Sequence, residues 1–166
     1  MRSGMLLVFT LILVRPVQSA FFPLPHGFVN SGTPKHYGSP EQKLADGSIF
    51  DYMDGGGIVY LDHGFQKLAH WEFSNFRNGL ITMDRFTFDT SEQALAALAD
   101  ERIAPADGAP LPLQVTNKAY RFPPDYFVYL VWDRHLLYLH VNDDRLAETL
   151  DQFAVDVLKS LKEEKE

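Results

Sequence analysis

The sequence contains no cysteine. Disulfide bonds, thiolate catalysis and thiolate metal sites are therefore excluded, and so is a lipid anchor on an N-terminal cysteine. A fold without covalent cross-links must be stabilised by its hydrophobic core. The chain has the material for such a core, because it contains 13 phenylalanines, seven tyrosines and two tryptophans.

The sequence also lacks the short motifs of common catalytic sites. No Gly-x-Ser-x-Gly segment marks a nucleophilic serine, and no His-Glu-x-x-His segment marks a zinc hydrolase. The histidine pairs His63 and His70, and His135 and His140, are spaced so that a zinc centre would need ligands from distant parts of the fold. We therefore predict no catalytic residue and no cofactor, and the identity of any bound metal stays open.

Long hydrophobic runs are absent after the first residues. Met5–Val14 is an apolar run of about ten residues behind the basic Arg2, and Val17–Ser19 has side chains that a signal peptidase accepts. This pattern predicts a signal peptide at residues 1–19, which is shorter than the roughly 20 apolar residues of a membrane span. We expect the mature protein in the periplasm or secreted, with no integral membrane segment after cleavage.

Basic residues are scarce. Lysine and arginine number 15 against 22 acidic residues, and loss of Arg2 and Arg15 with the signal peptide leaves 13 basic residues and a net charge of about −9. This charge argues against a nucleic-acid partner and against binding to anionic lipid surfaces. The roughly 147 mature residues suit one domain with a single core.

The remaining pattern predicts a single α+β domain at residues 44–161, between an extended Pro/Gly-rich lead-in (20–43) and a charged tail (162–166). Alternation predicts strands at 65–73 and 80–88, joined by a hairpin at Asn78-Gly79. Thr90 and Gln93 have the form of a capping box, and the helix they open ends near residue 102. The later elements are strands at 113–122, 126–132 and 135–141 and a helix at 144–161. Together they predict a mainly antiparallel sheet of about five strands with helices packed mostly on one face.

Three consecutive glycines, Gly55–Gly57, follow a short predicted helix and lie inside an apolar segment. In one explanation they provide a bend or close backbone packing, and Asp54 caps the helix end. In the other, the loop gathers groups around a ligand, with carboxylates and an imidazole holding a hard cation or free amides holding an anion. The candidate ligand-binding residues are Asp54, Gly55, Gly56, Tyr60, Asp62 and His63.

Aromatic residues are concentrated in the last three predicted strands, at Tyr120, Tyr126, Tyr129, Trp132 and Tyr138. On a concave sheet such residues can hold an apolar or sugar ligand. The alternative is ordinary packing in the core and across strands. Residues 126–132 have no polar side, which predicts a central strand with helices on one face and another element or a partner on the other.

Three polar residues fall on the predicted hairpin strands. Glu72 and Asp84 can face one another as an acid pair, and His70 is expected at the sheet surface beside a hydrogen-bonding neighbour. Because exposed carboxylates are common on sheets, we assign no glycosidase role to the pair.

The segment around the glycines resembles the signature of a family of uncharacterised exported bacterial proteins, a domain of unknown function. Its pattern is Tyr, Ile or Met, Asn or Asp, Gly, Gly or Ala, Ala, Glu, any residue and Tyr, and then Tyr-Gly-Phe. The matching residues are Tyr52, Met53, Asp54, Gly55, Gly56, Tyr60, Gly64 and Phe65. The chain differs at Gly57-Ile58, where the pattern has Ala-Glu, and at His63, where an aromatic is usual. The resemblance implies an envelope or secreted location and no established activity.

These observations favour an exported cell-envelope module that binds an envelope protein or a small ligand without catalysis. One alternative is a metal-dependent or hydrolytic enzyme with its site at the glycine loop, using Asp54, Asp62 and His63. Another is an oligomeric assembly protein with the strand near Trp132 at a subunit interface.

Overall fold

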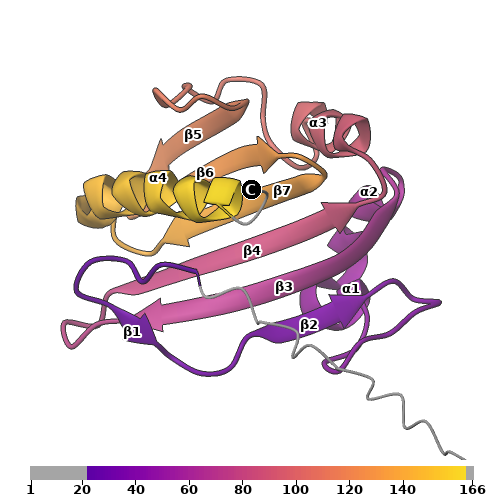
Figure 1. Ribbon diagram of the computed structural model, residues 1–166, viewed down its shortest axis with the longest axis horizontal. Coiled ribbons are helices and arrows are strands. Elements are labelled where there is room, and N and C mark those ends of the chain that lie inside the picture. Colours follow the sequence, from indigo (N-terminus) through magenta and orange to yellow (C-terminus); the bar gives the residue numbers. More distant parts are fainter. Residues whose placement is uncertain (1–21, 164–166) are drawn as a thin grey trace, which may run out of the picture.

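The computed structural model describes residues 22–163. The predicted signal peptide and the last three residues of the predicted tail lie outside this range. The described chain forms one sheet of seven strands in the order β1-β3-β4-β7-β6-β5, in which neighbours are antiparallel and β2 also pairs with β3 (Figure 1). The strands are β1 (Val29–Asn30), β2 (Lys35–Gly38), β3 (Phe65–Ser74), β4 (Leu80–Phe88), β5 (Asn117–Phe122), β6 (Asp125–Trp132) and β7 (His135–Val141).

The helices follow the order of the chain. They are α1 (Ile49–Met53), the 3₁₀ turn η1 (Asp54–Gly56), α2 (Gly57–Leu61), α3 (Ser91–Ala99), the 3₁₀ turn η2 (Asp144–Leu146) and α4 (Ala147–Glu163). Thr90 caps the start of α3 as predicted, since Thr90 Oγ1 accepts a hydrogen bond from Gln93 N and Gln93 Oε1 accepts one from Thr90 N. This exchange satisfies amides that a helix start leaves unpaired.

The α+β fold with a mainly antiparallel sheet is confirmed, but the predicted number of strands was too low. The two additional strands, β1 and β2, lie in the predicted lead-in. Both strands pair with β3 at the edge of the sheet. Pro34 directly precedes β2, and Gly38, the last residue of β2, lies so close to the backbone of Gln42 that a side chain would not fit there. Prolines and glycines are tolerated at an edge, where a strand needs hydrogen bonds on one side only.

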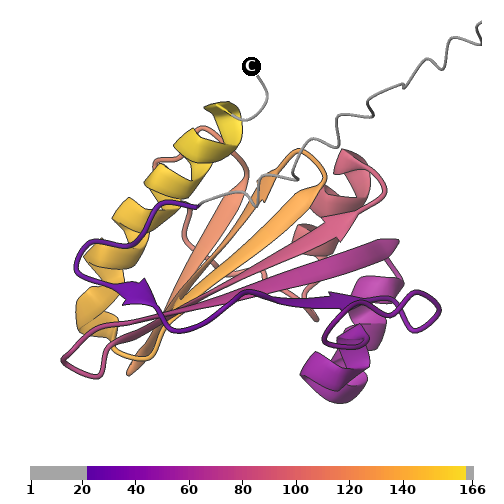
Figure 2. The same cartoon turned by 60° about the horizontal axis from the view of Figure 1, so that its bottom comes forward.

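Helices cover both faces of the sheet, whereas the sequence predicted them mostly on one face. α4 packs on β6 and β7 on one face, and α1, α2 and α3 lie on the other (Figure 2). The cause is clear in β6, where Val128 and Leu130 belong to the core under α4 while Tyr129 and Val131 belong to the core under α3. Successive residues of a strand point to opposite faces, so a strand without a polar side needs cover on both.

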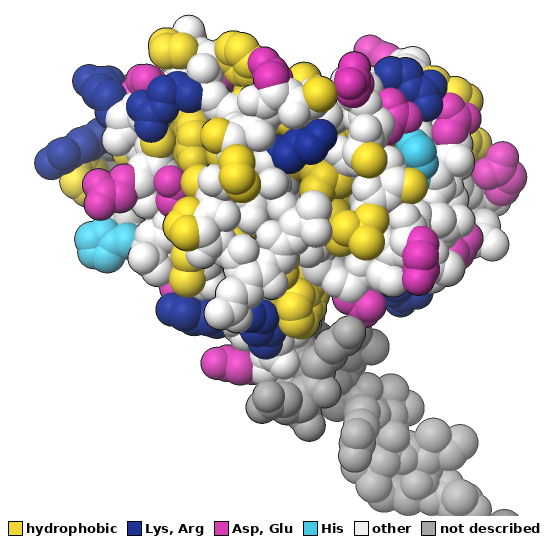
Figure 3. All heavy atoms as spheres, turned by 90° about the horizontal axis from the view of Figure 1, so that it is seen from above, with side chains coloured by type: hydrophobic (Ala, Val, Ile, Leu, Met, Phe, Trp, Pro, Cys, Tyr) yellow, Lys and Arg dark blue, Asp and Glu magenta, His cyan; other side chains and the backbone are white. Residues whose placement is uncertain are grey.

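The surface combines charged residues with isolated apolar ones. Figure 3 shows one face of the molecule, on which hydrophobic side chains reach the surface in several separate places between charged side chains. Among residues 22–163, no helix is long and apolar enough to cross a membrane.

The centre of the core under α3 provides a test of the packing. Phe86 is 1% exposed and stacks on Tyr60 at a ring-centroid distance of 4.2 Å. Phe86→Ala is expected to lower the free energy of unfolding by about 3–5 kcal/mol, because it removes a buried ring and leaves a cavity. Phe76→Ala is the matched control, since Phe76 is 88% exposed. Urea unfolding of both variants measures the difference, and equal effects would contradict this packing.

Candidate functional site

The glycine run joins two short helices, since Gly55 and Gly56 belong to the 3₁₀ turn η1 after α1 and Gly57 is the first residue of α2. Gly57 is buried at the start of α2, and a Cβ added there would lie 3.0 Å from Ile49 Cγ2. Gly55 and Gly56 are exposed, and a Cβ on either would meet no atom within 4 Å. Close packing of α2 on α1 therefore requires only the third glycine.

Asp54 has the unusual backbone in this turn. Its φ is 46° and its ψ is −136°, a region that L-residues rarely adopt, whereas none of the three glycines has a positive φ. Its side chain is exposed, and among the described residues it makes no hydrogen bond or ion pair with Asp62 or His63. The turn therefore contains backbone strain but does not bring the predicted ligand groups together.

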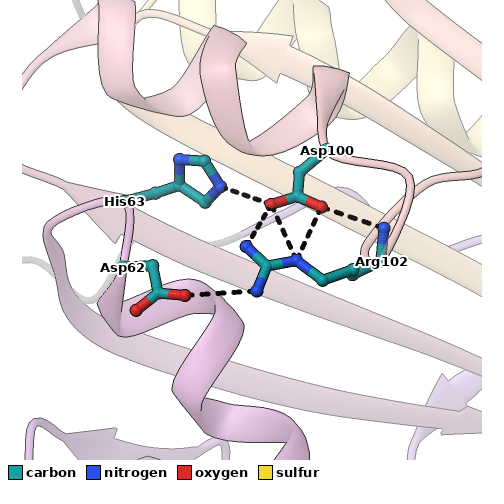
Figure 4. Close-up of polar contacts among 4 residues, drawn as sticks. All are labelled: Asp62, His63, Asp100 and Arg102. Carbon is teal, nitrogen blue, oxygen red and sulfur yellow. Dashed lines mark hydrogen bonds and ion pairs between the residues drawn. The ribbon is translucent and has the colours of Figure 1, made fainter.

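Asp62 and His63, at the end of α2, do come together, but with partners from the end of α3 (Figure 4). His63 Nε2 lies 2.9 Å from Asp100 Oδ2, and Arg102 binds Asp100 through Nη2 at 2.6 Å. Arg102 Nη1 reaches Asp62 Oδ2 at 3.3 Å. The guanidinium of Arg102 and then the imidazole of His63 hold the pKa of Asp100 well below its usual range.

This cluster is a clamp between two helix ends. Each of its four side chains already has a partner of complementary charge or hydrogen bonding. Within residues 22–163, no three His, Asp or Glu side chains are grouped so that they could hold a metal ion. The remaining predicted residue, Tyr60, is buried against Phe86.

A second polar cluster, which the sequence did not assign, lies between α1 and the sheet. It consists of Tyr52, His70, Glu72 and Asp84, and we call it the His70 cluster. His70 Nδ1 lies 2.6 Å from Asp84 Oδ1, and the Tyr52 hydroxyl donates to Asp84 Oδ2 at 2.8 Å. On the other side of the ring, His70 Nε2 lies 3.1 Å from Glu72 Oε1. His70 and Asp84 are buried, while the Glu72 side chain is 45% exposed.

The surroundings set the protonation of this cluster. Burial lowers the pKa of His70, but the hydrogen bonds and charges of Asp84 and Glu72 together outweigh it and raise the pKa above its ordinary value. Burial, followed by the charge of Asp84, raises the pKa of the Tyr52 phenol far above its usual range. The phenol therefore remains a hydrogen-bond donor, and the imidazole is held between two carboxylates.

The rings of the last three strands form a continuous row on the same face of the sheet. We call this row the aromatic ladder, and it consists of Tyr120, Phe122, Phe127, Tyr129, Tyr138 and His140. Adjacent centroids lie 4.8–6.4 Å apart, from Tyr129 and Tyr138 at 4.8 Å to Tyr120 and Phe122 at 6.4 Å. Tyr126 and Trp132 face α4 instead, where the Tyr126 hydroxyl donates to Asp151 and Lys162 lies over the Trp132 ring.

Strand register places the ladder beside the His70 cluster. Asp84 pairs with Tyr138, and Thr82, opposite Glu72, pairs with His140. Cross-strand partners share a face of the sheet. The ladder and the cluster therefore form one strip, which we call the sheet-face strip, and its side chains range from buried to about half exposed.

A separate groove of about 720 Å³ lies along α4, the helix on the opposite face of the sheet (Figure 2). Its walls combine apolar residues with charged ones, and they include Leu24, Leu111, Leu113, Glu148, Asp151 and Asp156. None of the residues of the sheet-face strip lines this groove.

Comparison with known proteins gives one likeness in fold. The extracellular domain of PknH from Mycobacterium tuberculosis, known from a crystal structure, superposes with a TM-score of 0.51. The match covers 82% of this chain and 86% of that domain at 11% sequence identity. No protein-family model and no curated protein matches the sequence. The likeness therefore shows a shared fold, and the family resemblance of the glycine segment stays a prediction.

The raised pKa of His70 predicts how stability depends on pH. A histidine with a folded-state pKa above its unfolded value contributes stability that is complete below about pH 6.5 and is lost as pH rises through the folded-state pKa. The difference in unfolding free energy between wild type and His70→Gln is therefore expected to shrink from pH 6 to pH 9. Urea unfolding across this range measures it, with exposed His26→Gln as the control. A difference that grows with pH would contradict the assignment.

The backbone of Asp54 predicts a stabilising substitution. Asp54→Gly is expected to raise the free energy of unfolding by about 1 kcal/mol, because glycine adopts a positive φ without strain. Calorimetry measures the change, and Asp62→Gly, at a helical φ and with loss of the Arg102 contact, should destabilise instead. Calcium that stabilises wild type but not Asp54→Gly would show that the Asp54 carboxylate holds a cation.

Proposed function

We propose that this chain is an exported α+β module that binds a small ligand or a partner on its sheet-face strip without catalysis. The predicted signal peptide and the likeness of the fold to an extracellular domain support the export. The negative net charge fits a partner other than a nucleic acid.

The observation that carries the binding proposal is the composition of the strip. Half-buried rings lie next to polar groups that reach solvent, since Phe122 is 54% exposed, Asp125 46% and Glu72 45%. Ligand sites in proteins combine an apolar lining with a few well-placed polar groups. The rings also hold one another through stacked and edge contacts, so the surface is ordered before a ligand arrives.

The chemistry of the His70 cluster favours a supporting role over a reaction. A nucleophile needs a lowered pKa or an adjacent base with free capacity. Here the Tyr52 phenol has a raised pKa, and both nitrogens of His70 are occupied by carboxylates. The cluster instead fixes α1 to the sheet and orients Glu72 at the edge of the strip.

The proposal is tested by mapping binding on the exported protein. A library of aromatic and aliphatic fragments, screened by amide chemical shifts, is expected to perturb residues of β5, β6 and β7 around the ladder. Tyr138→Ala should abolish these shifts, because it removes the ring that joins Phe127 and Tyr129 to His140. Phe76→Ala, at an exposed hairpin tip, is the control.

Two results would contradict the proposal. One is a set of shifts confined to the groove along α4, and the other is recovery of the protein with an uncleaved N-terminus in the cytoplasmic fraction.

A further inference from the structure

At the β5 end of the aromatic ladder, an exposed aromatic ring lies beside a carboxylate that is paired with an imidazole. Phe122 is the most exposed ring of the ladder, and its register partner across the β5–β6 turn is Asp125. His140 Nε2 lies 2.8 Å from Asp125 Oδ1. Because register partners share a face, the ring and the polar pair lie side by side.

Phe122 does not stand alone. Its ring centroid lies 5.9 Å from that of Phe127 with the planes 29° apart, and 6.4 Å from that of Tyr120 with the planes 14° apart. Three nearly parallel rings support one another, and the outermost one meets solvent. Such a ring loses little conformational freedom when a ligand packs on it.

The polar pair limits the chemistry of a ligand at this position. An anion would be repelled by Asp125 and by the negative net charge of the protein. A wholly apolar ligand would displace water from Asp125, whose Oδ2 has no hydrogen-bond partner among the described residues. Burial of a carboxylate oxygen without a donor is costly. The ligand must therefore offer an apolar face for the ring and hydrogen-bond donors for the carboxylate, and a sugar combines the two through its C–H face and its hydroxyls.

We propose that this end of the sheet-face strip binds a neutral pyranose sugar. The C–H face of the sugar packs on Phe122, its hydroxyls donate to Asp125, and His140 fixes the orientation of the carboxylate. The proposal rests on the proposed function, since it names the ligand class of the same strip.

The rest of the strip extends the site beyond one sugar unit. The row that contains Phe127 and His140 continues through Thr82 to Glu72, three strands away from β6. At about 4.8 Å between neighbouring strands, this distance is about 14 Å. Thr82 and the exposed Glu72 carboxylate offer further hydrogen-bonding groups, so we expect a disaccharide or a longer chain to bind more tightly than glucose.

Titration calorimetry on the full exported protein tests this assignment. The probes are glucose, maltose, cellobiose and N,N′-diacetylchitobiose, with choline and inorganic phosphate as charged comparisons. At least one disaccharide is expected to bind, and Phe122→Ala should weaken that affinity about tenfold or more, as removal of an aromatic anchor does. Asp125→Asn should weaken it as well, while Phe76→Ala should leave it unchanged.

The assignment is overturned if no disaccharide binds, if choline or phosphate binds in its place, or if Phe122→Ala binds as wild type does. Should Phe122→Ala misfold by circular dichroism, Asp125→Asn decides the outcome, and an unchanged affinity in that variant overturns the assignment. Fragment shifts on the strip without any sugar binding would refute the sugar alone, whereas the absence of both would refute the binding function too.

Discussion

Burial of the central strands from both sides is the constraint on which the rest of the structure depends. β6 and β7 carry apolar residues on both faces, so neither face can be left to water. On one face the 17-residue helix α4 provides continuous cover. On the other, α1, α2 and α3 are short, and the aromatic ladder occupies the remaining area by packing rings against rings. The sheet-face strip is thus a consequence of incomplete helical cover.

Local pattern was sufficient for most elements of the fold. The Asn78-Gly79 hairpin, the capping box at Thr90 and the stripe of α4 each depend on residues close in sequence, and each element is present within a few residues of its predicted bounds. The strand β2 could not be predicted this way, because its pairing with β3 spans about thirty residues. The segment 126–132 has no polar side and so predicted that both faces of this strand are covered. Pattern alone does not say which helix lies on which face.

The candidate site was harder to predict than the fold, because its groups meet through register and helix packing. Asp62 and His63 were noticed in sequence, yet their partners Asp100 and Arg102 lie about forty residues away. The pairing of His70 with Asp84 could have been predicted from the sequence, because each lies seven residues from Arg77 in the hairpin turn and an antiparallel register then places them opposite each other. Of the explanations for the glycine run, close backbone packing applies to Gly57, whereas the positive φ in this turn is at Asp54.

The buried phenols have a consequence for alkaline conditions. Burial raises the pKa of Tyr138 to about 12 and those of Tyr52, Tyr60 and Tyr129 further still. Ionisation of these hydroxyls is disfavoured within the native structure, whereas in the unfolded chain they ionise near pH 10, because each buried phenolate would lose its hydration and lie near the Asp84 carboxylate. Above that pH the unfolded chain releases phenolic protons that the folded chain retains, so rising pH favours unfolding. The tyrosines that shape the strip thus also make the native state less stable as pH rises above about 10, the ordinary pKa of a phenol.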